Sequence, residues 1–413
     1  MGPTATLARR LGTRDAVLIG LGSMVGAGIF TAVGPAAAAA GAWLLLGLAL
    51  AALVALCNAM SSAWLAARYP ESGGTYVYGR RRLGPAWGFM AGWAFVVGKT
   101  ASCAAMAFTI GAYLWPSHAR ALAVAAVVVL VALNCTGIER TAAATRVLLA
   151  ITLFALAVTV AALLLSDAPI TSASAAGGGS ATGVLQAAAF FFFAFAGYAR
   201  IATLGEEVRD PERTIPRAIP MALGLALALY AVVTASALWA VGADALASSQ
   251  APLATAVEDG SLSGLAPIVR AGAAVASVGV LLALIAGISR TGLAMARGGD
   301  APSWLAAVHP RFRTPYRAEI AVGMLVVVLI AFGDLRGAIG FSSFTILGYY
   351  AIANASALTL PRGHARGSRL LPAAGIAGCI ALAACLPAAT VLQGAIVLGA
   401  GALLAAVRHV ARD

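Results

Sequence analysis

Long apolar stretches recur along the whole chain, and they constrain its fold more than any other feature. Stretches of 18 or more apolar residues are long enough for a helix to cross the hydrocarbon core of a bilayer. The composition agrees, because 61% of the residues are hydrophobic and only 10% are charged, whereas a soluble domain carries about 25% charged residues. The sequence therefore predicts an all-α polytopic membrane protein and excludes a soluble one.

The apolar pattern predicts about twelve transmembrane helices joined by short connections. Their expected ranges are 15–39, 42–67, 86–114, 119–137, 143–165, 183–205, 217–241, 264–292, 318–333, 337–360, 369–388 and 390–409. No connection is long enough for a separate soluble domain, so we expect one membrane domain over 1–413.

The net charge of +12 reports topology and does not indicate nucleic acid as a partner. Most of the 27 basic residues fall in predicted inner segments, and the predicted outer loops hold only Arg120 and Arg336. This positive-inside bias places both termini in the cytoplasm and the chain in the cytoplasmic membrane. The expected partners are a small molecule and the lipid bilayer, and the sequence does not indicate an oligomeric state.

The predicted spans lack the residues that catalysis or metal binding needs. The five cysteines and four histidines show no metal-ligand spacing, and no histidine or acid lies at mid-span to activate a nucleophile. A channel would need a filter motif, which is not visible. We therefore expect no enzyme, no cofactor and no metal site.

The first span is interrupted by glycines. Its residues 20–30 read GLGSMVGAGIF, and each glycine costs a helix about 1 kcal/mol relative to alanine. Irregular backbone persists in hydrocarbon only where it is buried in protein or lines a cavity. The interruption thus indicates a ligand site built from freed backbone groups. The alternative is a small-residue packing face, since Gly22 and Gly26 have the GxxxG spacing.

The sixth span carries a similar interruption at Gly197, within AAAFFFFAFAGYARIATLGEE (187–207). The first and sixth spans cross the membrane in opposite directions. Glycine-interrupted helices at corresponding places of two oppositely oriented halves are typical of inverted-repeat transporters. The expected halves are 15–165 and 183–360, with 369–409 as two additional helices.

Four motifs follow one another along the chain. They are GLGSMVGAGIF (20–30), ARYPESGGTYVYGRRRLG (67–84), FAFAGYARIATLGEEVRDPERTIPRAI (193–219) and GISRTGLAMARGGDAPSWLAAVHPRFRTP (287–315). In residues, order and spacing they resemble the amino acid permeases of the amino acid–polyamine–organocation (APC) superfamily, over roughly 15–360. The resemblance implies a LeuT-like fold of two five-helix inverted repeats, with substrate held between broken helices 1 and 6, and secondary active transport by alternating access.

The chemistry of the two interruptions suits a zwitterionic amino acid. Freed N–H groups at a helix start favour a carboxylate, and freed carbonyls of the sixth span would accept hydrogen bonds from an ammonium group. Relatives place an aromatic gate where this chain has Phe193, which could equally be one more ring of an apolar run. The predicted substrate-binding residues are Met24, Gly26, Ala27, Gly28, Phe193, Phe195, Ala196 and Gly197.

The acidic residues bear on the substrate class. All fifteen fall at span ends or in loops, and where some cationic-substrate relatives have an acid this chain has Ala199. This favours neutral amino acids. An amine or polyamine carrier and an amino acid exporter or exchanger stay as alternatives.

Lys99 is the only lysine in the sequence, and it lies near the middle of the third span. An intramembrane charge costs about 2.5–3.5 kcal/mol on insertion scales and is a functional hypothesis by default. Several relatives carry a lysine in helix 5 that takes a sodium-like position, where this chain has Thr152. Either Lys99 supplies that charge and couples transport to protons, or Thr152 helps to form a sodium site. A structural lysine that donates to helix carbonyls is the third possibility.

Charged residues at the inner end of the sixth span form a candidate inner gate. Arg200 is expected to pair with Glu206 or Glu207, and Arg290 at the inner end of the eighth span is another candidate partner. The alternative for Arg200 is an arginine that reaches to the membrane interface.

Overall fold

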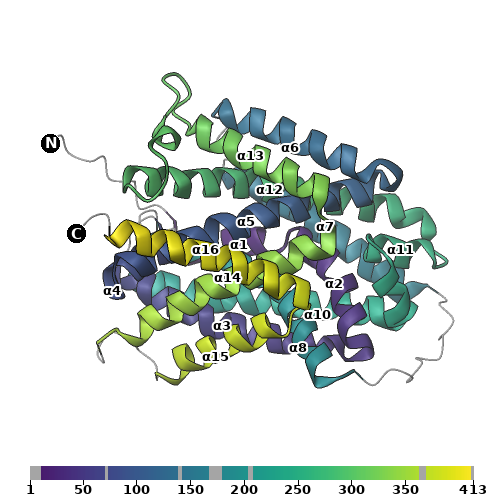
Figure 1. The fold of residues 1–413 in the computed structure, drawn as a ribbon. Helices are drawn as coiled ribbons and strands as arrows, with labels where there is room; N and C mark the ends of the chain where they lie inside the picture. Colours follow the sequence, from purple (N-terminus) through teal and green to yellow (C-terminus); the bar gives the residue numbers. More distant parts are fainter. Residues whose placement is uncertain are drawn as a thin grey trace.

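The computed structural model describes residues 11–69, 73–137, 142–166, 179–202, 208–361 and 369–410. These residues are helical, apart from loops and one parallel bridge between Leu11 and Val208. The long helices lie side by side in one bundle (Figure 1). Eight helical segments in this part of the chain are long and apolar enough to cross a membrane, which supports a multi-pass membrane protein.

The helices follow the order of the expected spans. Two short helices, α4 and α11, form in stretches expected to be polar connections. The α-helices are α1 (Thr13–Met24), α2 (Ala27–Ala40), α3 (Leu44–Arg68), α4 (Thr75–Arg82), α5 (Pro85–Leu114), α6 (Ala119–Cys135), α7 (Ala142–Leu165), α8 (Ala181–Phe195), α9 (Ala199–Ala202), α10 (Pro211–Ser248), α11 (Pro252–Glu258), α12 (Ala266–Arg297), α13 (Tyr316–Phe332), α14 (Leu335–Leu358), α15 (Leu370–Ala384) and α16 (Ala388–Val410).

Helix α10 is longer at both ends than the expected 217–241. Pro211 starts the helix, where its missing N–H costs nothing. Near the other end Gly242 leaves the helical region with φ 75° and ψ 173°, so the helix is kinked there. The expected span ended at 241, whereas the chain resumes the helix after Gly242.

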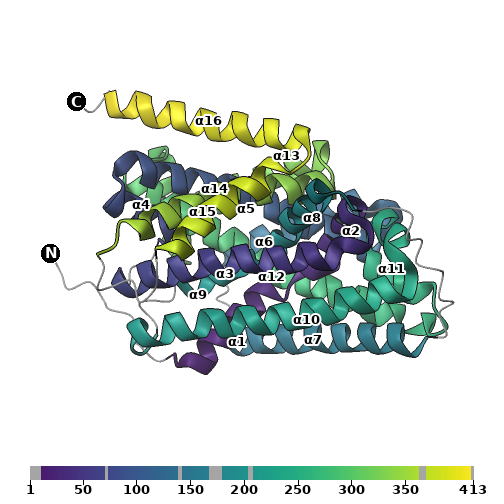
Figure 2. The ribbon, with the colours of Figure 1, turned by 90° about the horizontal axis from the view of Figure 1, so that it is seen from below.

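Helix α5 forms the centre of the bundle (Figures 1 and 2). Every residue from Gly98 to Tyr113 is buried, and α5 packs against both α12 and α14. A Cβ on Gly98 would lie 2.3 Å from Oγ1 of Thr345 on α14. Small residues therefore bring these helices into close contact, as is common in membrane bundles.

The peripheral helices expose large apolar side chains. Examples are Val128 of α6, Phe154 of α7, Met324 of α13 and Ile396 of α16, each more than half exposed. Helix α16 lies at one edge of the bundle in Figure 2. Such surfaces fit lipid, which leaves outward-facing apolar side chains in an apolar medium.

Candidate functional site

The first span is broken between α1 and α2, at the expected place. Val25 has φ −75° and ψ 68°, and the Gly26 N–H donates to the Met24 carbonyl at 2.7 Å. This combination is an inverse γ-turn. Gly26 follows with φ −123° and ψ −148°, outside the helical region, and α2 then starts at Ala27.

The break leaves backbone groups without helical partners. The N–H groups of Ala27, Gly28 and Ile29 belong to the first turn of α2, where a helix offers them no acceptor. Within the described residues no hydrogen bond to these three groups is found. They are deeply enclosed, because Ala27 and Ile29 have no exposed surface. Adjacent N–H groups at a buried helix start are a favourable environment for an anion.

The sixth span changes its hydrogen bonding at the expected place but does not unwind. Helix α8 ends at Phe195, a 3₁₀ turn covers Ala196–Tyr198, and α9 follows. The dihedral angles of Ala196 and Ala199 stay in the right-handed helical region. A 3₁₀ turn pairs each amide one residue closer along the chain than an α-helix does. The Ala194 carbonyl therefore loses its α-helical partner.

Glycines bring the two breaks into contact. A Cβ on Gly28 would lie 2.7 Å from the Cα of Ala194, and a Cβ on Gly197 would lie 2.2 Å from the Ser23 carbonyl oxygen. Neither position has room for a side chain. Close packing at Gly28 and Gly197 thus holds α1 and α2 against α8 and the 3₁₀ turn, whereas Gly22 and Gly26, the pair of the alternative interpretation, face Thr145 and Val280.

Three buried tyrosines donate to carbonyls around the breaks, and sequence reasoning missed all three. Tyr230 of α10 donates to the Met24 carbonyl at 2.6 Å, Tyr113 of α5 donates to Phe30 at 2.6 Å, and Tyr350 of α14 donates to Ala196 at 3.4 Å. A buried hydroxyl needs a partner. A tyrosine in the middle of an apolar span was therefore a usable signal, but the acceptor could not be known.

The remaining predicted binding residues line the same region. Met24 is 2% exposed and Ala196 is 4% exposed. Phe193 lies two residues before the end of α8 and keeps 9% of its surface exposed, while Phe192 and Phe195 have none. Phe193 is thus the phenyl ring of this run with the most accessible surface.

Lys99 lies in the central helix α5. It is 9% exposed and is the only buried basic residue in the described part of the chain. No hydrogen bond or ion pair of its ammonium group is found among the described residues, and its electrostatic neighbour is Cys103, one turn along the helix. Gly92 lies seven residues earlier, on the same helix face, and faces Met295 of α12.

Thr152 lies in α7 and is 1% exposed. Its hydroxyl donates to the carbonyl of Leu148 in its own helix at 2.8 Å. Seven residues earlier on the same face, Thr145 lies against Gly22 of α1. Helix α12 packs against both α5, which carries Lys99, and α7, which carries Thr152.

The candidate inner gate is described only in part. Arg200 is an exposed residue of α9, while Glu206 and Glu207 lie outside the described residues, so their pairing with Arg200 stays a prediction. Arg290 of α12 acts electrostatically on Glu319, a buried acid in the first turn of α13. Sequence reasoning did not anticipate this neighbour.

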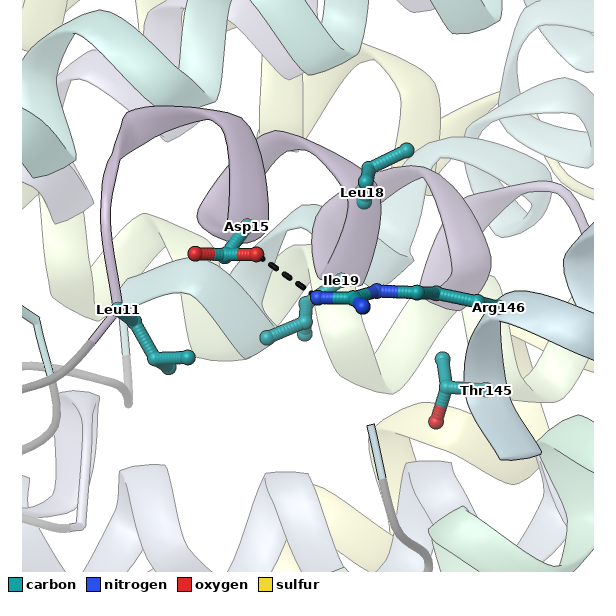
Figure 3. Close-up of a pocket in the computed structure, with 6 residues that line it drawn as sticks. All are labelled: Leu11, Asp15, Leu18, Ile19, Thr145 and Arg146. Atoms are coloured by element: carbon teal, nitrogen blue, oxygen red, sulfur yellow. Dashed lines mark hydrogen bonds and ion pairs between the residues drawn. The ribbon is translucent and has the colours of Figure 1, made fainter. Parts of the chain in front are cut away.

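A surface pocket lies at the start of α1, away from the break. Its lining is Leu11, Asp15, Leu18, Ile19, Thr145 and Arg146 (Figure 3). Asp15 and Arg146 form an ion pair across it at 3.0 Å, and both are at least one third exposed. This site lacks the buried amides of the break, so we do not assign the substrate to it.

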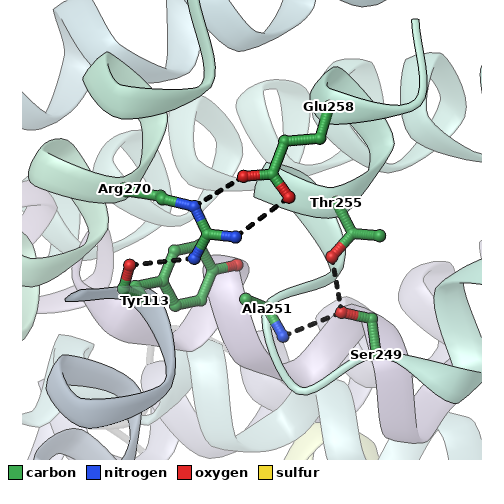
Figure 4. A network of polar contacts seen from close by, with 6 residues as sticks. All are labelled: Tyr113, Ser249, Ala251, Thr255, Glu258 and Arg270. Atoms are coloured by element: carbon green, nitrogen blue, oxygen red, sulfur yellow. Dashed lines mark hydrogen bonds and ion pairs between the residues drawn. The ribbon is translucent and has the colours of Figure 1, made fainter. Parts of the chain in front are cut away.

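Polar contacts tie the short helices to the bundle at two places. Arg270 of α12 forms a bidentate ion pair with Glu258 of α11 and also donates to the Tyr113 carbonyl (Figure 4). In α4, Tyr76 donates to the buried Asp300 at 2.9 Å, and Arg80 pairs with the same carboxylate. These contacts hold α4 and α11 in place, and most residues of α11 are buried as well.

A family model for amino acid permeases matches residues 15–389. The chain belongs to the amino acid permease family. This confirms the resemblance of the four motifs, and it identifies a transporter and not an enzyme.

The relatives of this permease agree on transport and differ in the substrates that their names give. Uncharacterized transporters of Mycobacterium tuberculosis and Mycobacterium bovis are 59% identical over 405 residues, which is 98% of this chain and 92% of theirs. A branched-chain amino acid permease of Bacillus subtilis is 26% identical over 78% of this chain and 75% of its own. The human cationic amino acid transporter 4 is 29% identical over 84% of this chain and 59% of its own.

Proposed function

We propose that this permease is a secondary active transporter that carries neutral amino acids across the cytoplasmic membrane by alternating access. Twelve transmembrane helices form two inverted five-helix repeats, 15–165 and 183–360, followed by two further helices at 369–409. The termini lie in the cytoplasm. The observation that carries the proposal is the set of buried N–H groups at Ala27–Ile29, which have no hydrogen-bond partner among the described residues and are held against the end of α8.

In this proposal the substrate lies between the two breaks. Its carboxylate accepts hydrogen bonds from the N–H groups of Ala27, Gly28 and Ile29, and the positive end of the α2 dipole adds to this attraction. Its ammonium group donates to carbonyls at the end of α8, around Phe195 and Ala196. Met24, Gly26 and Gly197 shape the backbone of the site, and Phe193 covers it.

The acids of the permease support a neutral substrate. A cationic amino acid or an amine brings an additional positive charge, which is costly in a buried site without a partner. The described Asp and Glu residues that are buried are Asp300 and Glu319. Asp300 pairs with Arg80, and Glu319 faces Arg290. Neither belongs to the breaks, so a zwitterion is the better match.

Lys99 is our candidate for the group that couples transport to protons. It is buried, it lies in the central helix, and its ammonium group has no hydrogen-bond partner among the described residues. A lysine in such surroundings can lose and regain its proton as the protein changes conformation. Thr152 already donates to Leu148, but its oxygen can still accept, so a sodium site there is the competing arrangement.

Uptake into proteoliposomes tests the proposal. The purified permease is supplied with radiolabelled leucine, alanine, arginine or putrescine, with an imposed proton gradient, an imposed sodium gradient or neither. We expect saturable uptake of a neutral amino acid that is driven by the proton gradient. Uptake of putrescine alone would refute carboxylate capture, and strict dependence on sodium would favour Thr152 over Lys99.

A further inference from the structure

The hydroxyl of Tyr230 lies between the two helix breaks. It donates to the Met24 carbonyl at 2.6 Å and lies 3.2 Å from the Ala194 carbonyl. Both carbonyls have lost their α-helical partners, Met24 through the γ-turn and Ala194 through the 3₁₀ turn that follows it. One hydroxyl thus lies within hydrogen-bond distance of the freed carbonyl of each break, and its single proton serves the nearer one, that of Met24.

Tyr230 is itself held firmly in place. It has no exposed surface, and its ring lies 5.2 Å from the ring of Phe195 at an interplanar angle of 52°. Its helix α10 packs against α1, α2 and α3. The hydroxyl is therefore held in a fixed position beside the non-helical segment around Val25 and Gly26.

Although its residues are closely packed, the γ-turn has few other hydrogen bonds among the described residues. Among the backbone amides of the described residues, only the Gly26 N–H is found to donate to the Met24 carbonyl, and Gly26 has more conformational freedom than any residue with a side chain. A carbonyl oxygen has two lone pairs, and Tyr230 uses the second one. Without that hydrogen bond the turn can rotate, and the N–H groups of Ala27, Gly28 and Ile29 would change direction with it.

We propose that Tyr230 is a positioning residue for substrate binding. By holding Met24 beside Ala194, it keeps the first-turn amides of α2 directed at one place before the substrate arrives. Binding then does not have to order the segment, and this preorganisation raises affinity. The inference rests on the proposed function, because it assigns the amides to the substrate carboxylate.

Tyr230→Phe is the informative variant, because it removes the hydroxyl and keeps the ring against Phe195. Tyr113→Phe is a matched control. Tyr113 is equally buried and also donates at 2.6 Å to a carbonyl of this span, that of Phe30. Phe30 lies inside α2, where its carbonyl keeps a helical partner. The control therefore loses the same kind of bond without loosening the break.

Two measurements on the full-length protein test the proposal. In proteoliposomes, we expect Tyr230→Phe to raise the KM for the transported amino acid five- to tenfold, which corresponds to about 1–1.4 kcal/mol. The maximal rate should stay within twofold, and Tyr113→Phe should leave KM within twofold. In substrate-free protein, we expect faster amide hydrogen exchange at residues 25–30 in Tyr230→Phe than in wild type or Tyr113→Phe.

These measurements separate failure of the inference from failure of the proposed function. If wild-type protein takes up no amino acid, the proposed function fails, while hydrogen exchange still tests whether Tyr230 holds the turn. If the wild type transports and the KM of Tyr230→Phe is unchanged, the positioning role alone is refuted. It is also refuted if Tyr113→Phe raises KM equally, if only the maximal rate falls, or if exchange at 25–30 does not change.

Discussion

Gly197 gives the sharpest test of how the two helix breaks fit together. A Cβ at this position would lie 2.2 Å from the Ser23 carbonyl oxygen, 2.5 Å from the Ser23 carbonyl carbon and 2.7 Å from the Met24 nitrogen. All three are backbone atoms, so no side-chain rotation can relieve the clash. Gly197→Ala must therefore push the end of α1 and the 3₁₀ turn apart.

The size of the effect follows from these distances. Ordinary van der Waals contact begins near 3.4 Å, so the two segments must separate by about 1 Å. Overpacking of this kind costs about 1–3 kcal/mol. Because the shift occurs beside the γ-turn, we also expect weaker substrate binding, and hence less stabilisation by added substrate.

Thermal unfolding of the detergent-purified permease, with and without the transported amino acid, measures both effects. Gly224→Ala is the matched control, since Gly224 is exposed on α10 and a Cβ there would meet nothing within 4 Å. We expect Gly197→Ala to unfold at a lower temperature, and Gly224→Ala to unfold at the wild-type temperature or slightly above it, because alanine is favoured over glycine in a helix by about 1 kcal/mol. A Gly197→Ala protein with wild-type unfolding temperature and substrate response would refute the packing of the two breaks.

Three further predictions concern charged groups. Lys99→Met should abolish proton-driven uptake while counterflow exchange of substrate persists. If uptake by Lys99→Met still responds to the proton gradient as in the wild type, the coupling role is contradicted. Asp300→Asn should destabilise the permease by about 1.5–3 kcal/mol, because Tyr76 and Arg80 lose a charged acceptor; a chemical-denaturant series checks this. Arg270→Met should lower the unfolding temperature more than Glu258→Gln does, because Arg270 also donates to the Tyr113 carbonyl, whereas Glu258→Gln weakens only the partly exposed ion pair, which contributes about 1 kcal/mol or less. Equal effects of the last two variants would contradict that ranking.

Helix positions could be predicted from the sequence because a helix that crosses the hydrocarbon core of a bilayer needs about 20 consecutive, mostly apolar residues. The expected 86–114 is observed as Pro85–Leu114, and the expected 119–137 as Ala119–Cys135. The break in the first span was predictable for a related reason, since clustered glycines weaken a helix at mid-membrane. The short helices α4 and α11 were not, because long-range contacts such as Arg270 with Glu258 stabilise them.

A multi-pass helical membrane protein of the amino acid permease family, with a first helix interrupted near Gly26, could be inferred from the amino-acid sequence alone. Apolar length, glycine content and motif order are local properties, so they can be read along the chain. Only the tertiary structure decided what surrounds the break. The contact of Gly197 with Ser23 and the hydrogen bond from Tyr230 to Met24 join residues far apart in sequence, and such pairings arise only when the helices pack.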